Sequence, residues 1–156
     1  MKAEVLNAFL AAAVGSLSKE TKGPVSRTGL QMDPTDQVTD EVTVYVAIVG
    51  QVRGMVLVGM PAITARSIAG GMVGEPQKEL TEMGLSALAE LGNLIAGGST
   101  IELEKAGLPK CDITPPTIMI GHRSRISTLG LPRFVIPIST IHGPLNIHVA
   151  VDVMPV

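Results

Sequence analysis

Aromatic residues and runs of like charge are scarce in this chain of 156 residues. It has no Trp, one Tyr and two Phe, so it lacks the aromatic side chains on which single-stranded nucleic acids stack. The formal net charge is −2 and the chain has no basic block, which disfavours an electrostatic surface for nucleic acid. Nucleic acid is therefore not an expected partner.

Cysteine and long apolar runs are also scarce. The single cysteine, Cys111, excludes an internal disulfide and is typical of a reducing compartment. The three histidines, His122, His142 and His148, lie apart with no second cysteine near them, so no metal site is expected. The longest charge-free stretch, residues 135–151, is broken by Pro, Gly and Asn and cannot be a membrane span. We expect a cytoplasmic protein that does not contact a membrane.

Apolar residues make up 46% of the chain and follow helical and strand periods. Residues 3–19 repeat apolar side chains with the period of a helix, and Glu4 and Asn7 interrupt them, so we expect an amphipathic core helix rather than a signal peptide. A second helix is expected over residues 62–73, after Pro61. A third is expected from about residue 79 to 106, before Gly107.

β-Branched and apolar residues predict about six strands between and after these helices. Pro115 and Pro116 would confine one of them to a sheet edge or a bulge. The mixture predicts an α+β fold for residues 1–156 as a single domain, with long helices packed on antiparallel β-hairpins. The expected extended segments are residues 25–32, 42–49, 55–60, 113–120, 134–141 and 145–153.

The third helix has two distinct faces. At about 100° per residue, one narrow stripe holds a hydroxyl, an acid, an amide and a glycine, at Ser86, Glu90, Asn93 and Gly97. Leu88, Leu91 and Ile95 lie on the opposite side. Because Gly92 and Gly97 each cost a helix about 1 kcal/mol relative to Ala, this surface is a candidate for close approach by another molecule. An ordinary polar face of an amphipathic helix is the alternative.

The two halves of the chain are weakly alike, since each runs from a helix through a break to a strand and a β-hairpin. Glu4 and Asn7 repeat in the first helix the spacing of Glu90 and Asn93. The repeated spacing has two explanations. One is a degenerate internal duplication, and the other is the coincidence of two common residues on two amphipathic helices.

The stretch from Ser86 through Glu90 to Asn93, followed after twenty-two residues by Pro116, resembles the motif of the CheC/CheX/FliY phosphatases of bacterial chemotaxis. The neighbouring Ala96-Gly97 and the segment from Asp112 to Pro116 are similar to the CheX branch. The resemblance implies a pseudo-symmetric α+β domain. It also implies a phosphatase for the aspartyl phosphate of a CheY-like response regulator.

Under this resemblance Glu90 and Asn93 are the catalytic pair. A neutral carboxamide can hold a water without repelling the phosphoryl group, so Asn93 would orient the attacking water. Glu90 would pair with the active-site Lys of the regulator. Ser86 would support docking or local packing, and Pro116 would be structural. Gly92, together with Ala96 and Gly97, would leave room for the helix to lie across a second protein.

The second candidate motif departs from the family pattern, because Leu6 precedes Asn7 and Leu30 stands where the matching Pro would be. Glu4 and Asn7 are therefore expected to be an inactive, solvent-facing relic. The CheX likeness implies a homodimer, for which the apolar segments 134–141 and 145–153 could supply strand edges. No cofactor of the chain's own is expected, and Mg²⁺ would belong to the regulator.

Two other classes of function remain open. One is a non-catalytic module that binds a regulator or acts in a flagellar switch, since related folds occur there. The other, a binder of an apolar small molecule, has little support because the sequence displays no convergent polar cluster beyond this helix. The water-positioning amide favours the phosphatase, because a scaffold has no need of one.

Overall fold

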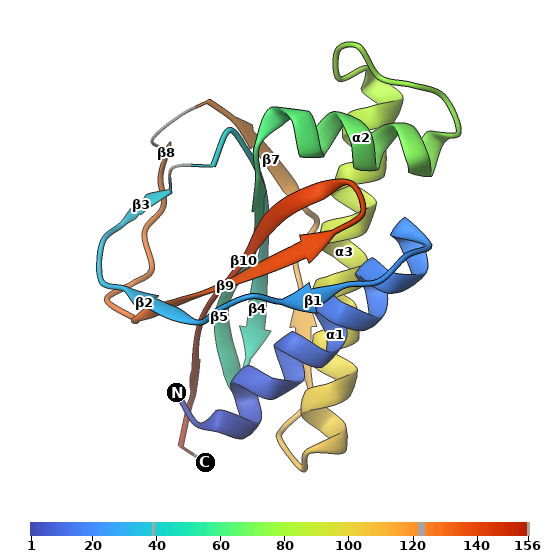
Figure 1. The fold of residues 1–156 in the computed structure, drawn as a ribbon. Helices are drawn as coiled ribbons and strands as arrows, with labels where there is room; N and C mark the ends of the chain where they lie inside the picture. Colours follow the sequence, from blue (N-terminus) through green and yellow to red (C-terminus); the bar gives the residue numbers. More distant parts are fainter. Residues whose placement is uncertain (39, 122–123, 156) are drawn as a thin grey trace.

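The computed structural model describes residues 1–38, 40–121 and 124–155. Within them, three helices lie on one side of an eight-stranded sheet (Figure 1). The helices are α1 (Ala3–Thr21), α2 (Ala62–Val73) and α3 (Glu82–Lys105). The strands are β1 (Ser26–Arg27), β2 (Gln31–Asp33), β3 (Gln37–Val38), β4 (Val42–Gly50), β5 (Val52–Met60), β6 (Cys111–Ile113), β7 (Thr117–Ile120), β8 (Ser124–Arg125), β9 (Arg133–Thr140) and β10 (Gly143–Val153).

The main sheet is antiparallel throughout, in the order β1-β9-β10-β5-β4-β6. Strand β2 also pairs with β9, and β7 also pairs with β4. Strands β3 and β8 form a separate short pair. Helices packed on antiparallel hairpins confirm the α+β prediction.

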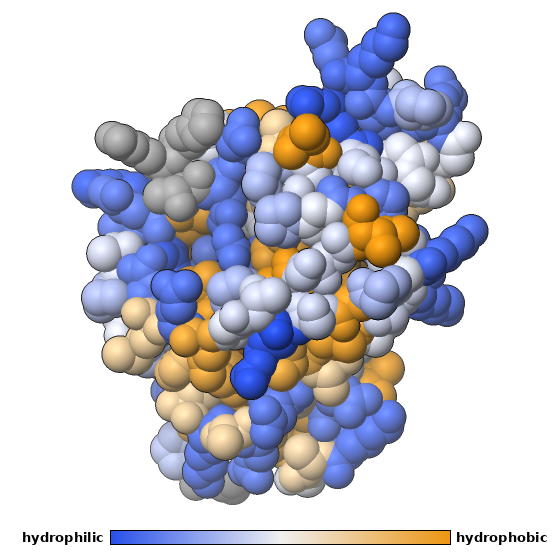
Figure 2. Space-filling view, viewed as in Figure 1, coloured by the Kyte–Doolittle hydropathy of each residue, from blue (hydrophilic) through white to orange (hydrophobic). Residues whose placement is uncertain are grey.

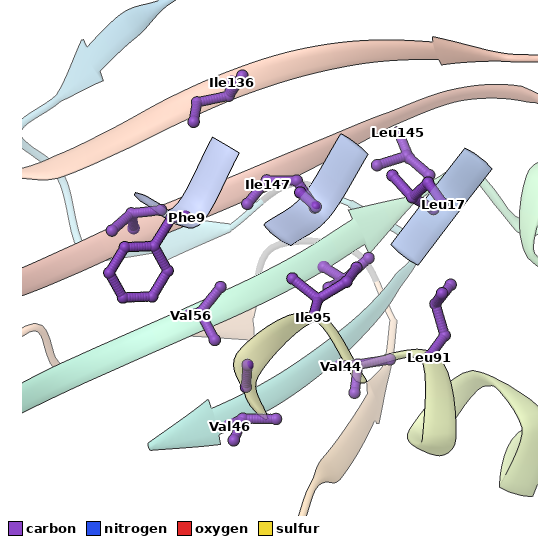
Figure 3. Packing of buried hydrophobic residues seen from close by; sticks show 14 of the residues in the cluster. Phe9, Leu17, Val44, Val46, Val56, Leu91, Ile95, Ile136, Leu145 and Ile147 are labelled. Atoms are coloured by element: carbon purple, nitrogen blue, oxygen red, sulfur yellow. The ribbon is translucent and has the colours of Figure 1, made fainter. Parts of the chain in front are cut away.

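The helices and the sheet share one apolar core. Helices α1 and α3 pack side by side, and both contact the sheet (Figure 1). Figure 3 shows Phe9 and Leu17 of α1 and Ile95 of α3 converging on strand residues such as Val56 and Ile147. All five are at most 1% exposed. Helix α3 is thus held firmly along its inner side, which fixes the direction of its outer side.

The ends of the helices follow local signals. Helix α2 spans the predicted residues 62–73, between Pro61 and Gly74, and Gly74 adopts a φ of +84°. Helix α3 begins later than predicted because Thr81 is its N-cap, whose Oγ1 accepts a hydrogen bond of 3.1 Å from the amide of Gly84. It ends as expected before Gly107, where φ is +83°.

The final hairpin does not offer the free strand edges that the sequence suggested. Strand β10 lies between β9 and β5. Strand β9 pairs on its other side with β1 and β2, which come from the residues predicted only as extended. The expectation that residues 134–141 and 145–153 leave apolar edges for a second copy is therefore wrong. Residues 26–33 pair with β9, and β10 is paired on both sides, with β9 and β5.

The face of the sheet away from the helices carries a second, smaller apolar cluster, made by Val38, Met55, Leu57, Ile126 and Ala150. On the side of the molecule drawn in Figure 2, apolar residues gather in the middle and polar residues lie above and below them.

No helix in the described part of the chain combines the length and hydropathy needed to cross a membrane.

Candidate functional site: the outer face of helix α3

Helix α3 presents the predicted motif on its outer side. Ser86 and Glu90 are exposed and Asn93 is half-buried, whereas Leu88 and Leu91 are completely buried against the core. The two faces inferred from helical spacing are therefore confirmed. The side chains of the motif point away from the sheet, where another protein can reach them.

Neither Glu90 nor Asn93 uses its side chain within the protein. Among the residues that the structure describes, neither makes a hydrogen bond or an ion pair with another part of the chain. The carboxylate can therefore accept hydrogen bonds or pair with a cation, and the amide keeps one acceptor and two donors. Both groups are available to a partner without breaking an existing contact.

Gly92 and Ala96 do not belong to this open face. Both are buried, and a Cβ built on Gly92 would lie 2.4 Å from Cγ1 of Val44 on β4. Gly92 thus lets α3 approach its own sheet, and the expectation that Gly92 and Ala96 make room for a second protein is wrong. Gly97 differs, because a Cβ there would meet only Cδ1 of Ile113, at 3.9 Å.

Pro116 lies in a bulge at the sheet edge beside α3. Ile113 faces Ile48, but Thr117 faces Tyr45, so one extra residue is accommodated between β6 and β7 relative to β4. Both strands contact α3. The prediction that the two prolines sit at an edge or a bulge is confirmed, and Pro116 is half-buried there.

The motif lies on an exposed helix face, away from the larger cavities. Cavities of about 310 to 530 Å³ open elsewhere on the described residues, and neither Glu90 nor Asn93 lines them. Small-molecule sites are normally concave and enclose most of their ligand. A side-chain pair on an exposed helix suits a substrate that is itself a protein.

The second candidate motif faces solvent as expected. Glu4 and Asn7 are both exposed on α1, and Leu30 is 46% exposed before β2. The pair lies on a different helix from Glu90 and Asn93.

The histidines and the cysteine do not form a metal-binding group in the described residues, and His122 lies outside them. No group there brings together three His, Cys, Asp or Glu side chains that could hold a metal ion. His142 follows β9, and its Nδ1 is 2.7 Å from Oγ of Ser67. Burial and the nearby carboxylates of Asp112 and Glu104 raise the pKa of the Cys111 thiol, which disfavours the nucleophilic thiolate.

The sequence did not predict a polar cluster that lies on the face of the sheet away from the helices. Asp40 accepts hydrogen bonds from Nδ2 of Asn146 at 3.1 Å and from Nε2 of His148 at 2.9 Å, the latter when that nitrogen carries its proton. The Arg133 guanidinium, 1% exposed as a side chain, donates to Asp33. Burial raises the pKa of Asp33, but hydrogen bonds from Thr35 and the charge of Arg133 outweigh it and lower that pKa below its ordinary value.

Comparison with known proteins assigns a family to this fold. A family model described as "Chemotaxis phosphatase CheX" matches residues 42–139. The CheY-P phosphatase CheX of Thermotoga maritima is 28% identical over 133 residues, which is 84% of each chain. The chemotaxis protein CheX of Desulfovibrio desulfuricans superposes with a TM-score of 0.85 at 21% identity, covering 96% of this chain and 99% of that one. CheX of Borrelia burgdorferi, solved as a CheX-CheY-BeF3-Mg complex, has a TM-score of 0.80 at 25% identity and covers 94% of this chain and 96% of that one.

Proposed function

The chain belongs to the CheX family of chemotaxis phosphatases, and we propose that it hydrolyses the aspartyl phosphate of a CheY-like response regulator. The observation that carries this proposal is the pair Glu90 and Asn93, whose side chains lie on the outer face of α3 and, among the described residues, have no internal partner. The relative from Thermotoga maritima is named for activity on phosphorylated CheY. The relative from Borrelia burgdorferi was crystallised with CheY.

Hydrolysis of an acyl phosphate requires a water placed in line with the bond that breaks. The water oxygen bonds to phosphorus, the bond from phosphorus to the aspartyl oxygen breaks, and phosphate and a free Asp carboxylate result. Catalysis then consists mainly of positioning and charge stabilisation. In this proposal Asn93 holds the water through its amide, in the role that a Gln has in GTPases.

Glu90 has a separate role in the proposal. It lies three residues before Asn93, so the two side chains share one face of α3. Its carboxylate would pair with the active-site Lys of the regulator and set how deeply Asn93 enters the site. The regulator would also supply Mg²⁺, and this chain would need no cofactor of its own.

Three other motif residues would support this geometry. Gly92 keeps α3 close to β4, and Pro116 shapes the neighbouring sheet edge. Ser86, exposed about one turn before Glu90, would contact the regulator. Glu4 and Asn7 would take no part in turnover.

A homodimer remains part of the proposal, although the strand edges that first suggested it are covered by the chain itself. The two copies would have to leave the outer face of α3 open. Light scattering at micromolar concentration should then give about twice the chain mass of 16.2 kDa. A monomer mass, or a dimer in which Asn93 is buried by the second copy, would contradict this part.

The test is a phosphate-release assay with purified, phosphorylated CheY-like proteins. Catalytic amounts of this chain should accelerate release from at least one of them well above its own rate. Tight binding to phosphorylated regulators without faster release would instead identify a non-catalytic binding module, and the phosphatase proposal would be wrong.

A further inference from the structure

A polar cavity opens on the face of the sheet away from the helices. It has a volume of about 310 Å³, and seven of its ten lining residues carry polar side chains. Strands β9 and β10 supply part of the lining, and residues 31–37 together with Asp40 supply the rest. Neither Glu90 nor Asn93 lines this cavity, so a molecule bound there would not occupy the outer face of α3.

The strands make room for a carboxylate in this cavity. Gly59 on β5 faces Asn146 on β10, and a Cβ built on Gly59 would overlap the carboxylate of Asp40. The Asp40 side chain is only 8% exposed. It accepts hydrogen bonds from Nδ2 of Asn146 at 3.1 Å and from Nε2 of His148 at 2.9 Å. The absence of a side chain at Gly59 therefore lets Asp40 lie directly against the sheet.

Hydrogen bonding determines the charge of His148. Its Nδ1 is buried and has no partner among the residues that the structure describes. A doubly protonated ring would bury an N–H without an acceptor at that position. A neutral ring with its proton on Nε2 donates to Asp40 and leaves Nδ1 as an acceptor, which costs less. Asp40 is therefore an anion whose two hydrogen-bond donors are both neutral.

The cavity has one negative charge in excess. Arg133 donates to Asp33, so the charges of these two residues cancel. Among the described residues no other charged side chain except Asp40 lines the cavity. A carboxylate as buried as Asp40 is normally paired with a cation. The hydrogen bonding of the lining is also incomplete, because Nε and Nη1 of Arg133 are buried and, like Nδ1 of His148, have no partner in the described part of the chain.

We propose that this cavity binds a small polar amine, whose ammonium group donates hydrogen bonds to the carboxylate of Asp40. Each Asp40 oxygen accepts one hydrogen bond from the protein and retains a second acceptor site. An ammonium group supplies the missing positive charge together with three donors. The exposed amides of Gln31 and Gln37 also line the cavity, which favours an amine that carries further hydrogen-bonding groups. A carboxylate ligand would instead be repelled by Asp40.

Three small molecules that all carry a hydroxyl group test the chemistry of the site. Ethanolamine has an ammonium group at neutral pH, choline has the same charge without an N–H, and glycolate has a carboxylate. Each is titrated into isotope-labelled protein, and the NMR signal of the Asn146 side-chain amide reports occupation of the cavity. Ethanolamine should shift this signal with a Kd about tenfold or more below those of choline and glycolate.

Two variants test the location. Asp40→Asn removes the charge with little change of shape, and Gln31→Lys places a tethered ammonium in the cavity. Both should weaken ethanolamine binding by about tenfold or more. Gln51→Lys is the matched control, because Gln51 is exposed in the turn between β4 and β5 and does not line the cavity, and it should bind as wild type does. Gln31→Lys changes an exposed residue and should keep the wild-type melting temperature, so it decides the location even if Asp40→Asn is unstable.

Four results would overturn the inference. Equal affinity for choline and ethanolamine would exclude hydrogen bonding by an ammonium group. Tighter binding of glycolate would make Arg133, and not Asp40, the group that selects the ligand. Unchanged ethanolamine binding by Gln31→Lys would place the ligand elsewhere. Binding of none of the three molecules would mean that Asp40, Asn146 and His148 only tie the chain before β4 to the sheet.

Discussion

Gly92→Ala should destabilise the protein although Ala is the better helix former. Alanine in place of Gly gains about 1 kcal/mol of helix propensity. The added Cβ would lie 2.4 Å from Cγ1 of Val44 and 3.2 Å from its Cβ, and Val44 is completely buried. Carbon atoms prefer a separation of about 3.5 to 4.0 Å, and Val is stiff at χ1, so we place the cost at the upper end of overpacking, about 3 kcal/mol. The net loss is then about 2 kcal/mol.

Thermal unfolding followed by circular dichroism measures this effect. A loss of about 2 kcal/mol in a chain of this length lowers Tm by about 4 to 8 °C. Gly97→Ala is the matched control in the same helix, since its Cβ has room, and it should raise Tm by about 2 to 4 °C. A Gly92→Ala variant as stable as Gly97→Ala would refute the close approach of α3 to β4.

Three further predictions concern charge and the second motif. Glu90→Lys should weaken binding of a beryllofluoride-loaded regulator by about tenfold or more, because it sets a cation against the regulator's Lys, and unchanged affinity would exclude the proposed ion pair. The double variant Glu4→Ala/Asn7→Ala should keep wild-type turnover, and loss of half of it would reveal a second working site. Asp33→Asn should cost about 1 to 2 kcal/mol in urea unfolding at neutral pH, because buried Arg133 loses a charged partner, one that is itself part-exposed. Folding lowers the pKa of Asp33 from 3.8, so the Asp33 carboxylate stabilises the folded state above that value, and this stabilisation disappears as the pH falls through the lower folded pKa. Asp33→Asn should therefore lose less stability than wild type on acidification. Equal losses would contradict the lowered pKa.

Local signals in the sequence predicted the helices well. Pro61 and Gly74 bound α2 as expected, and the spacing of Leu88 and Leu91 set the inner face of α3. The same spacing also places Gly92 on the Leu88 side of the helix, so its burial could have been predicted. The family motif instead suggested that Gly92 faces a partner, and that prediction was wrong.

Contacts between distant residues could not be predicted in this way. Asp40 and His148 are 108 positions apart, and nothing near either residue indicates the other. Strand β3 has only two residues, too few to display a period, so its pairing with β8 gave no signal. The cover of β9 by residues 26–33 depends on tertiary register, which is why the expected free edge was wrong.

The loss of phosphoryl groups from a CheY-like regulator, measured with wild type and Asn93→Ala side by side, tests the central claim most directly. The account predicts that the variant loses about 100-fold or more of the turnover rate. Its affinity for the beryllofluoride-loaded regulator should stay within about twofold, and its unfolding free energy within about 0.5 kcal/mol, because Asn93 lies on the outer face without an internal partner. Turnover by Asn93→Ala at the wild-type rate would contradict the account.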